Sequence, residues 1–206
     1  MKNMKKIFLI VLVVAVSSCA PKIKAQRLST DAGDKKAMNI TDEWLTTDTN
    51  LASKSIIEKI MNHGRFKRYL RENNYKTPKI FVGEIENKTS EDNFPVVALG
   101  NKILNDLFEN GEFDLISAKD RDRILKEIKF QNDGMVKASD IKSIGKASGA
   151  DLILFGEVVM EQKTSNGQTL KEYSLSVRLV EIESGEEVSR TLYEATKYSK
   201  RKKVGW

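Results

Sequence analysis

The segment Leu152–Met160 limits the possible folds of this chain most strongly, because it is the most apolar strand that the sequence predicts. Its first residues suit a strand buried on both faces of a sheet, and its later residues alternate. The following segment, Leu170–Ile182, alternates throughout, which indicates a strand with one buried face. Its residues divide into Tyr173, Leu175, Val177 and Leu179 on one side, and Ser174, Ser176 and Arg178 on the other. The two segments therefore predict adjacent strands of one sheet.

Turn signals connect these strands to a third. Asn166-Gly167 is a strong hairpin signal, although the connecting segment Lys163–Thr169 is longer than a two-residue turn. The residues Glu183–Glu186 predict a second turn, and Glu187–Tyr198 a third strand. An antiparallel meander is thus expected at the C-terminal end.

The first half of the chain reads as alternating helices and strands. Asp48 or Thr49 can cap a helix that runs past Gly64 to Asn73-Asn74. The other expected segments are the strand Lys79–Ile85, the polar loop Glu86–Asn93, a helix from Pro95 to Asn110-Gly111, the short strand Phe113–Ile116, a charged helix Lys119–Phe130, the loop Gln131–Met135 and a short helix capped by Ser139. Together they predict an α/β (α+β) sandwich: a mixed sheet of about five strands with helices packed against it.

The N-terminus has the layout of a secretory signal that ends in a cysteine. Lys2, Lys5 and Lys6 precede the apolar run Ile7–Val16, which is about half the length that crosses a bilayer. Ser17-Ser18-Cys19 then resembles a bacterial lipobox, in which lipid is attached to the cysteine and cleavage makes it the new N-terminus. This pattern predicts a covalent lipid on Cys19 that anchors the protein to a membrane without spanning it. Two alternatives are cleavage by ordinary signal peptidase, which leaves a free thiol, and a buried N-terminal core helix.

The predicted organisation has three parts: a signal peptide at 1–18, a flexible tether at 19–43, and one globular domain at 44–206 with a basic tail. The tether is assigned because the residues after Ala20 show neither helical nor strand periodicity. The formal net charge of +6 includes three signal lysines, so the mature chain is near +3. This small net charge of the mature chain argues against a nucleic-acid partner.

The sequence offers few residues for a catalytic, metal or cofactor site. Cys19 is the only cysteine, so no disulfide within the chain and no cysteine-based metal site are expected, and His63 has no second histidine to join it. No nucleophile elbow is present, and Gly145, Gly149 and Gly156 fit a helix stop and close packing in a strand better than a dinucleotide loop. We therefore expect no enzyme activity, no catalytic or metal site, no cofactor and no small-molecule substrate. The basic tail from Lys197 to Lys203 is interpreted as a solvated terminus, with acidic polymer or anionic head groups as an alternative contact.

Four segments resemble the LpoB family: Trp44–Thr49, Pro78–Ser90, Gly149–Gly156 and Leu179–Val188. The resemblance spans nearly all of the mature chain, in the family's order. It implies an outer-membrane lipoprotein on the periplasmic side that activates a class A penicillin-binding protein by allostery, with no catalytic residues of its own. Ala20, rather than aspartate, after the cysteine agrees with the periplasmic leaflet of the outer membrane. The tether is shorter than in better-known members of the family and contains only Pro21.

Two polar stretches are the candidate partner-binding residues: Asn87, Lys88, Thr89 and Ser90 in a loop, and Asp120, Arg121, Asp122 and Arg123 at a helix start. For the second stretch a solvated helix start is the alternative. For the whole protein, the alternative is a structural or assembly lipoprotein of the CsgG/TolB-like group, serving an envelope or secretion complex. The segment Lys163–Thr169 is too short for the membrane hairpins of CsgG-like proteins, so a pore is disfavoured.

Overall fold

Five strands form one mixed sheet in the order β2-β1-β3-β4-β5. The computed structural model describes residues 26–117, 120 and 138–200 of the chain. The strands are β1 (Lys79–Lys88), β2 (Asp114–Leu115), β3 (Leu152–Ser165), β4 (Gln168–Glu181) and β5 (Glu187–Lys200). β1 pairs in parallel with β2 and β3, whereas β3, β4 and β5 form an antiparallel meander. The predicted fold class and C-terminal meander are confirmed.

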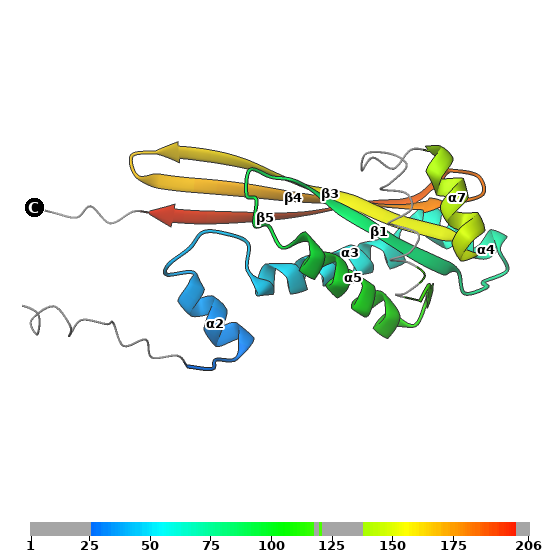
Figure 1. Ribbon diagram of the computed structural model, residues 1–206, viewed down its shortest axis with the longest axis horizontal. Helices are drawn as coiled ribbons and strands as arrows, with labels where there is room; N and C mark the ends of the chain where they lie inside the picture. Colours follow the sequence, from blue (N-terminus) through cyan, green and yellow to red (C-terminus); the bar gives the residue numbers. More distant parts are fainter. Residues whose placement is uncertain (1–25, 118–119, 121–137, 201–206) are drawn as a thin grey trace, which may run out of the picture.

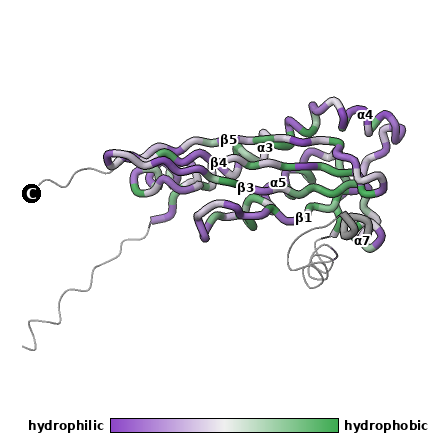
Figure 2. The backbone as a smooth tube through the Cα atoms, turned by 90° about the horizontal axis from the view of Figure 1, so that it is seen from above, coloured by the Kyte–Doolittle hydropathy of each residue, from purple (hydrophilic) through white to green (hydrophobic). Residues whose placement is uncertain are grey.

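Helices α3 (Thr46–Asn62), α4 (Gly64–Glu72) and α5 (Val96–Asn110) lie along one face of the sheet (Figure 1). They enclose the main core, which includes Ile56 and Ile60 of α3, Ile103 of α5 and Leu175 of β4. Figure 2 shows hydrophobic segments on β1 and β3, whereas α4 at the outside is largely hydrophilic. The sheet is therefore covered by a helical layer on the face that carries the main core.

A second, smaller core lies on the other face. Helix α7 (Ala138–Ser148) contributes Ile144, which is buried with Phe81 of β1, Ile153 of β3 and Val180 of β4. These three strand residues alternate with the residues of the main core, so the beginning of β3 is buried on both sides. This is the arrangement that the apolar run at the start of β3 predicts.

The β3–β4 hairpin closes more tightly than its sequence predicts. The pairing continues to Ser165 and Gln168, so only Asn166 and Gly167 form the turn, and the predicted loop Lys163–Thr169 is wrong. Both turn residues have positive φ, 50° at Asn166 and 72° at Gly167. A turn of this kind follows the right-handed twist of the strands, so ladder pairing extends to the tip.

The helix boundaries differ from prediction at α3 and α4. Helix α3 begins at Thr46, because the Asp48 carboxylate accepts the backbone N–H of Leu45 at 2.8 Å and caps the first turn from inside the helix. The helix then stops at His63, whose ψ of 128° is extended, and α4 starts as a separate helix. His63 Nδ1 accepts the N–H of Arg65 at 3.3 Å, so His63 has a capping role.

Helix α2 (Thr30–Ala37) lies within the segment predicted as a flexible tether, and for these residues the prediction of coil is wrong. The predicted charged helix Lys119–Phe130 and the loop Gln131–Met135 fall outside the described residues, apart from Asp120. Helix α7 already includes Ala138, one residue before the predicted cap Ser139. Within the described ranges, no helix is long and apolar enough to cross a membrane.

Candidate functional site

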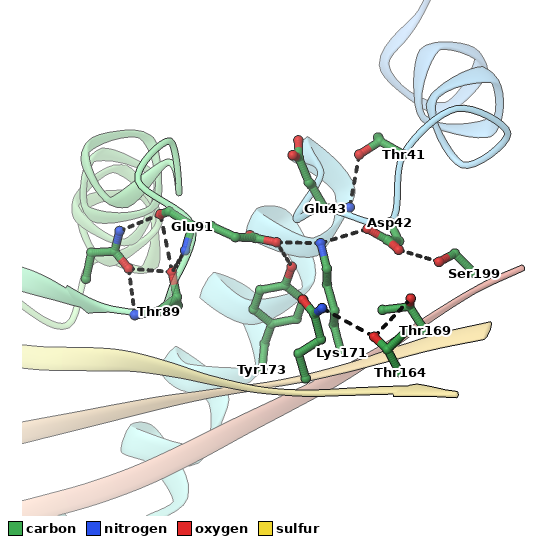
Figure 3. Close-up of polar contacts among 12 residues, drawn as sticks. Thr41, Asp42, Glu43, Thr89, Glu91, Thr164, Thr169, Lys171, Tyr173 and Ser199 are labelled. Carbon is green, nitrogen blue, oxygen red and sulfur yellow. Dashed lines mark hydrogen bonds and ion pairs between the residues drawn. The ribbon is translucent and has the colours of Figure 1, made fainter. Parts of the chain in front are cut away.

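Lys171 of β4 is the centre of a polar cluster at one end of the sheet (Figure 3). It lies in phase with the buried residues Tyr173 and Leu175, and its side chain is only 11% exposed. A buried ammonium group is costly unless it is paired. The Lys171 Nζ lies 2.7 Å from Asp42 Oδ1 and 2.7 Å from Glu91 Oε1. Lys171 therefore joins the segment before α3 to the loop before α5.

The partners of Lys171 have further hydrogen bonds. The Tyr173 hydroxyl donates to Glu91 Oε1 at 2.8 Å, and the Ser199 hydroxyl of β5 donates to Asp42 Oδ2. Burial raises the pKa of Tyr173, and its hydrogen bond to Glu91 raises that pKa further. We define the sheet-end cluster as Asp42, Glu91, Lys171, Tyr173 and Ser199.

Charge pairing sets the protonation of this cluster. The pKa of Asp42 is lowered from 3.8, first by the hydrogen bond from Lys171 and then by that from Ser199. For Lys171, burial alone would lower the pKa, but the hydrogen bonds to Asp42 and Glu91 outweigh it and leave the pKa above 10.5. The ammonium and the Asp42 carboxylate are thus both charged over a wide pH range.

Two of the predicted partner-binding residues shape the loop that carries Glu91. The Asn87 amide donates to the Glu91 carbonyl at 2.8 Å and accepts from the Thr89 backbone N–H at 2.9 Å and from the Thr89 hydroxyl at 2.7 Å. These bonds close a turn of the kind that asparagine favours. Asn87 is therefore a turn residue, and Thr89 shares this structural role.

The predicted loop Glu86–Asn93 begins too early, because β1 continues to Lys88 and pairs there with β3. The other two predicted partner-binding residues, Lys88 and Ser90, face solvent. The Lys88 side chain is 53% exposed and lies 2.6 Å from Glu86, and Ser90 is exposed. Asp92 and Asn93 are exposed in the same loop. The loop thus presents a polar surface on an internally bonded backbone.

Asp120 is exposed and is bonded only to a near neighbour among the contacts described. The Ser117 hydroxyl donates to its carboxylate at 2.6 Å, and the Asp120 N–H donates back to that hydroxyl at 3.2 Å. Arg121, Asp122 and Arg123 lie outside the described residues. Asp120 follows β2, which pairs with the start of β1, whereas Asn87 is at the end of β1, and no described hydrogen bond or ion pair joins the two predicted stretches.

An aromatic group supports the sheet-end cluster from the core side. Trp44 is 6% exposed, and its ring centre lies 5.2 Å from that of Phe94 and 5.3 Å from that of Tyr173. Its indole N–H donates to the Thr49 hydroxyl at 2.8 Å. Trp44 therefore fixes the start of the globular body next to Lys171.

The cluster is suited to holding segments together. Its ionisable groups are an ammonium between two carboxylates and a phenol bonded to one of them, and the Ser199 hydroxyl is bonded to the other carboxylate. Over the described part of the chain, no group of three or more histidine, cysteine, aspartate or glutamate residues is placed to hold a metal ion.

Lys197, predicted to belong to a solvated basic tail, instead lies 2.5 Å from Asp48 with its side chain 15% exposed.

Sequence reasoning missed the sheet-end cluster. A signal was present, because Lys171 continues the buried alternation of Tyr173, Leu175, Val177 and Leu179 by one step. A charged residue at a core-facing position requires partners. Their identity, Asp42 and Glu91, depends on contacts between residues that are 129 and 80 positions away from Lys171 in the chain.

Comparison with known proteins gives a family match over most of the folded part. The model of the family described as peptidoglycan-synthase activator LpoB matches residues 48–189. A search of curated proteins gave no match.

Solved structures with similarity to this chain include LpoB proteins. The NMR structure of Escherichia coli LpoB is 16% identical, with 90% of this chain and 84% of that chain covered and a TM-score of 0.48. The LpoB C-terminal domain of Salmonella enterica is 18% identical, with coverage of 63% and 90% and a TM-score of 0.44. Lipoprotein GNA1162 of Neisseria meningitidis is 18% identical, with coverage of 62% and 88% and a TM-score of 0.44.

Proposed function

The chain belongs to the LpoB family of peptidoglycan-synthase activators, and we propose that it binds and activates a class A penicillin-binding protein. The observation that carries the proposal is the family match over residues 48–189, which extends from the start of α3 into β5. The matched region contains the loop 87–93 and both predicted partner-binding stretches.

The proposed mechanism is allosteric. An activator of this kind binds the active conformation of the synthase more tightly than the inactive one, and so increases the population of the active form. It performs no chemistry itself.

We further propose that lipid on Cys19 holds the protein on the periplasmic face of the outer membrane. The signal layout and the lone cysteine support this anchoring. The segment from Ala20 onward then connects the anchor to the body, so its length limits how far from the membrane the body can act.

The proposed contact with the synthase is the exposed surface formed by Lys88 at the end of β1 and by Ser90, Asp92 and Asn93 in the loop after it. Asp120–Arg123 would be a separate contact, because β2 pairs with the opposite end of β1. Lys88 and Ser90 support this because both are exposed, Lys88 at the end of β1 and Ser90 in a turn that Asn87 and Thr89 fix. A polar surface on a preformed loop loses little conformational entropy on binding.

The first experiment is a pull-down with a Cys19→Ser chain as bait and detergent-solubilised membrane extract. Recovery of a class A penicillin-binding protein, followed by faster glycan polymerisation when the two purified proteins are mixed, is the expected result. Recovery of no synthase would refute the proposal. A stable ring-sized oligomer in detergent without synthase binding would favour an assembly lipoprotein instead.

The second experiment maps the contact by charge reversal. Lys88→Glu should weaken synthase binding about tenfold, because it replaces a positive charge at the interface by a negative one next to Glu86. The matched control is Arg68→Glu on α4, an exposed residue at the other end of the sheet (Figure 1). Equal affinity for both variants and the native protein would exclude the loop as the contact.

A further inference from the structure

Residues 30–43, which we call the strap, are folded back onto the body by polar contacts at two points. In α2, the Asp34 carboxylate accepts the backbone N–H of Thr47 at 2.7 Å, in the first turn of α3. After α2, Asp42 binds Lys171 and Ser199 at the far ends of β4 and β5 (Figure 3). The strap is therefore held both at the start of α3 and at the nearby end of the sheet.

The strap has almost no apolar attachment. No residue of α2 is buried, and the exposed fractions of Met38 and Ile40 are 60% and 86%. The next residue with a buried apolar side chain is Trp44, which is 6% exposed. Because hydrophobic burial is the main stabilising term for docked segments, the strap is held far more weakly than the chain from Trp44 onward.

Release of the strap would leave the body intact. Lys171 would keep Glu91 as a partner at 2.7 Å, so the buried ammonium would not be left unpaired. Helix α2 has 8 residues, which is too short to persist in isolation, so a released strap becomes coil. The two states thus differ in the length of free chain before Trp44.

We propose that the strap can detach from the body and so lengthen the tether. Docking of the strap then holds the body close to the membrane, and its release lets the body reach farther away. This rests on the proposed lipid anchor at Cys19. With the strap docked, residues 20–29 span at most about 35 Å, and with the strap released, residues 20–43 span at most about 80 Å. Release therefore more than doubles the distance over which the body can meet a synthase.

A distance measurement tests the strap independently of the anchor. The full chain carries Cys19→Ser, so that spin labels attach only at Gly33→Cys in α2 and Glu194→Cys on β5; both sites are free of the strap's contacts. The native strap should give one narrow distance distribution. Asp42→Asn should give a broad distribution centred at longer distance, and should raise the rate of trypsin cleavage after Lys35 and Lys36 about tenfold.

The matched control is Glu43→Gln, which removes the neighbouring carboxylate without touching Lys171 or Ser199. It should behave as the native chain, and Asp34→Asn should reproduce the effect of Asp42→Asn. An unchanged circular dichroism spectrum shows that the body stays folded in each variant. A broad distribution in the native chain, or a narrow one in both Asp42→Asn and Asp34→Asn, would overturn the proposal.

A second measurement connects the strap to reach. The lipidated full chain is bound to vesicles of bacterial phospholipid that contain a quencher lipid, with a fluorophore on Ser184→Cys in the exposed β4–β5 turn. Asp42→Asn should be quenched less than the native chain and than Glu43→Gln. Equal quenching would contradict the reach model, whereas a chain that does not bind vesicles at all would contradict the anchor and leave the spin-label result standing.

Discussion

At the residue scale, Lys171 shows how one charge can hold three segments. Replacing it by methionine keeps most of the volume but leaves the carboxylates of Asp42 and Glu91 facing each other without a cation. We expect Lys171→Met to lower the free energy of unfolding by about 2 kcal/mol, measured by urea titration at neutral pH. Lys88→Met is the control, since Lys88 is 53% exposed, and it should change stability by less than about 0.5 kcal/mol. Equal effects of the two variants would contradict this assignment.

Two glycines make opposite predictions because their surroundings differ. A Cβ on Gly156 of β3 would lie 2.4 Å from the Ser176 carbonyl oxygen of the paired strand, so Gly156→Ala should destabilise by about 2 kcal/mol. Gly100 lies inside α5 with nothing within 4 Å of its Cβ position, and Gly100→Ala should stabilise by about 0.5–1 kcal/mol. Thermal unfolding of both variants measures the difference. A gain in stability for Gly156→Ala would mean that the strands separate without cost.

At the element scale, β5 carries two hydroxyls on its buried face that have no hydrogen-bond partner among the described residues. These are Ser189 Oγ and Thr191 Oγ1. Since an unpaired buried hydroxyl is costly, Ser189→Ala and Thr191→Val should be neutral or stabilise by up to about 1 kcal/mol. The control is Ser53→Ala in α3, which loses a 2.6 Å hydrogen bond to Asp106 and should destabilise by about 1–2 kcal/mol. Denaturant midpoints that fall for all three variants would show that the two β5 hydroxyls do have partners in solution.

Some helices and strands could be predicted from sequence patterns and others could not. The strands were predictable because period-two alternation records which face is buried, as at Leu175 and Val177. The end of α3 at His63 was not, because the apolar positions of α3 and α4 read as one continuous pattern and only the extended backbone of His63 separates them. Helix α2 was missed because none of its residues is buried, so it carries no apolar periodicity.

At the scale of the whole molecule, acid should release the strap before it unfolds the body. The Asp42 carboxylate faces Lys171 of β4 and Ser199 of β5, with Glu91 on the other side of the same ammonium. Because the pKa of Asp42 is lowered below 3.8 in the docked state, its contribution to docking is complete above that pH and is lost as pH falls through the lowered value. The Lys171 ammonium contributes to docking throughout the acidic and neutral range. Its contribution is lost only in alkaline solution, as the pH rises through the raised pKa of Lys171.

The expected result is a constant spin-label distance from about pH 5 to pH 9, and a longer, broader one as the pH falls through the lowered pKa of Asp42. The Asp42→Asn chain should show the long distance at every pH, and circular dichroism reports whether the body remains folded in acid. A native distance that stays short at every acidic pH at which the body is folded would show that Asp42 does not control docking.

The sequence alone determined which strands are buried, the C-terminal meander and the family of the chain, because alternation, turn residues and local motifs are properties of neighbouring positions. It also placed Cys19, whose lipidation stays a prediction. Only the tertiary structure decided that Asp42, Glu91 and Lys171 meet, and that part of the tether is folded against the body. These depend on pairings between residues distant in the chain, and the energy of an ion pair depends on the burial that such pairings create. Cys19 is thus the position at which an anchor is expected. The docking of Asp42 sets how much of the chain after that anchor can act as a tether.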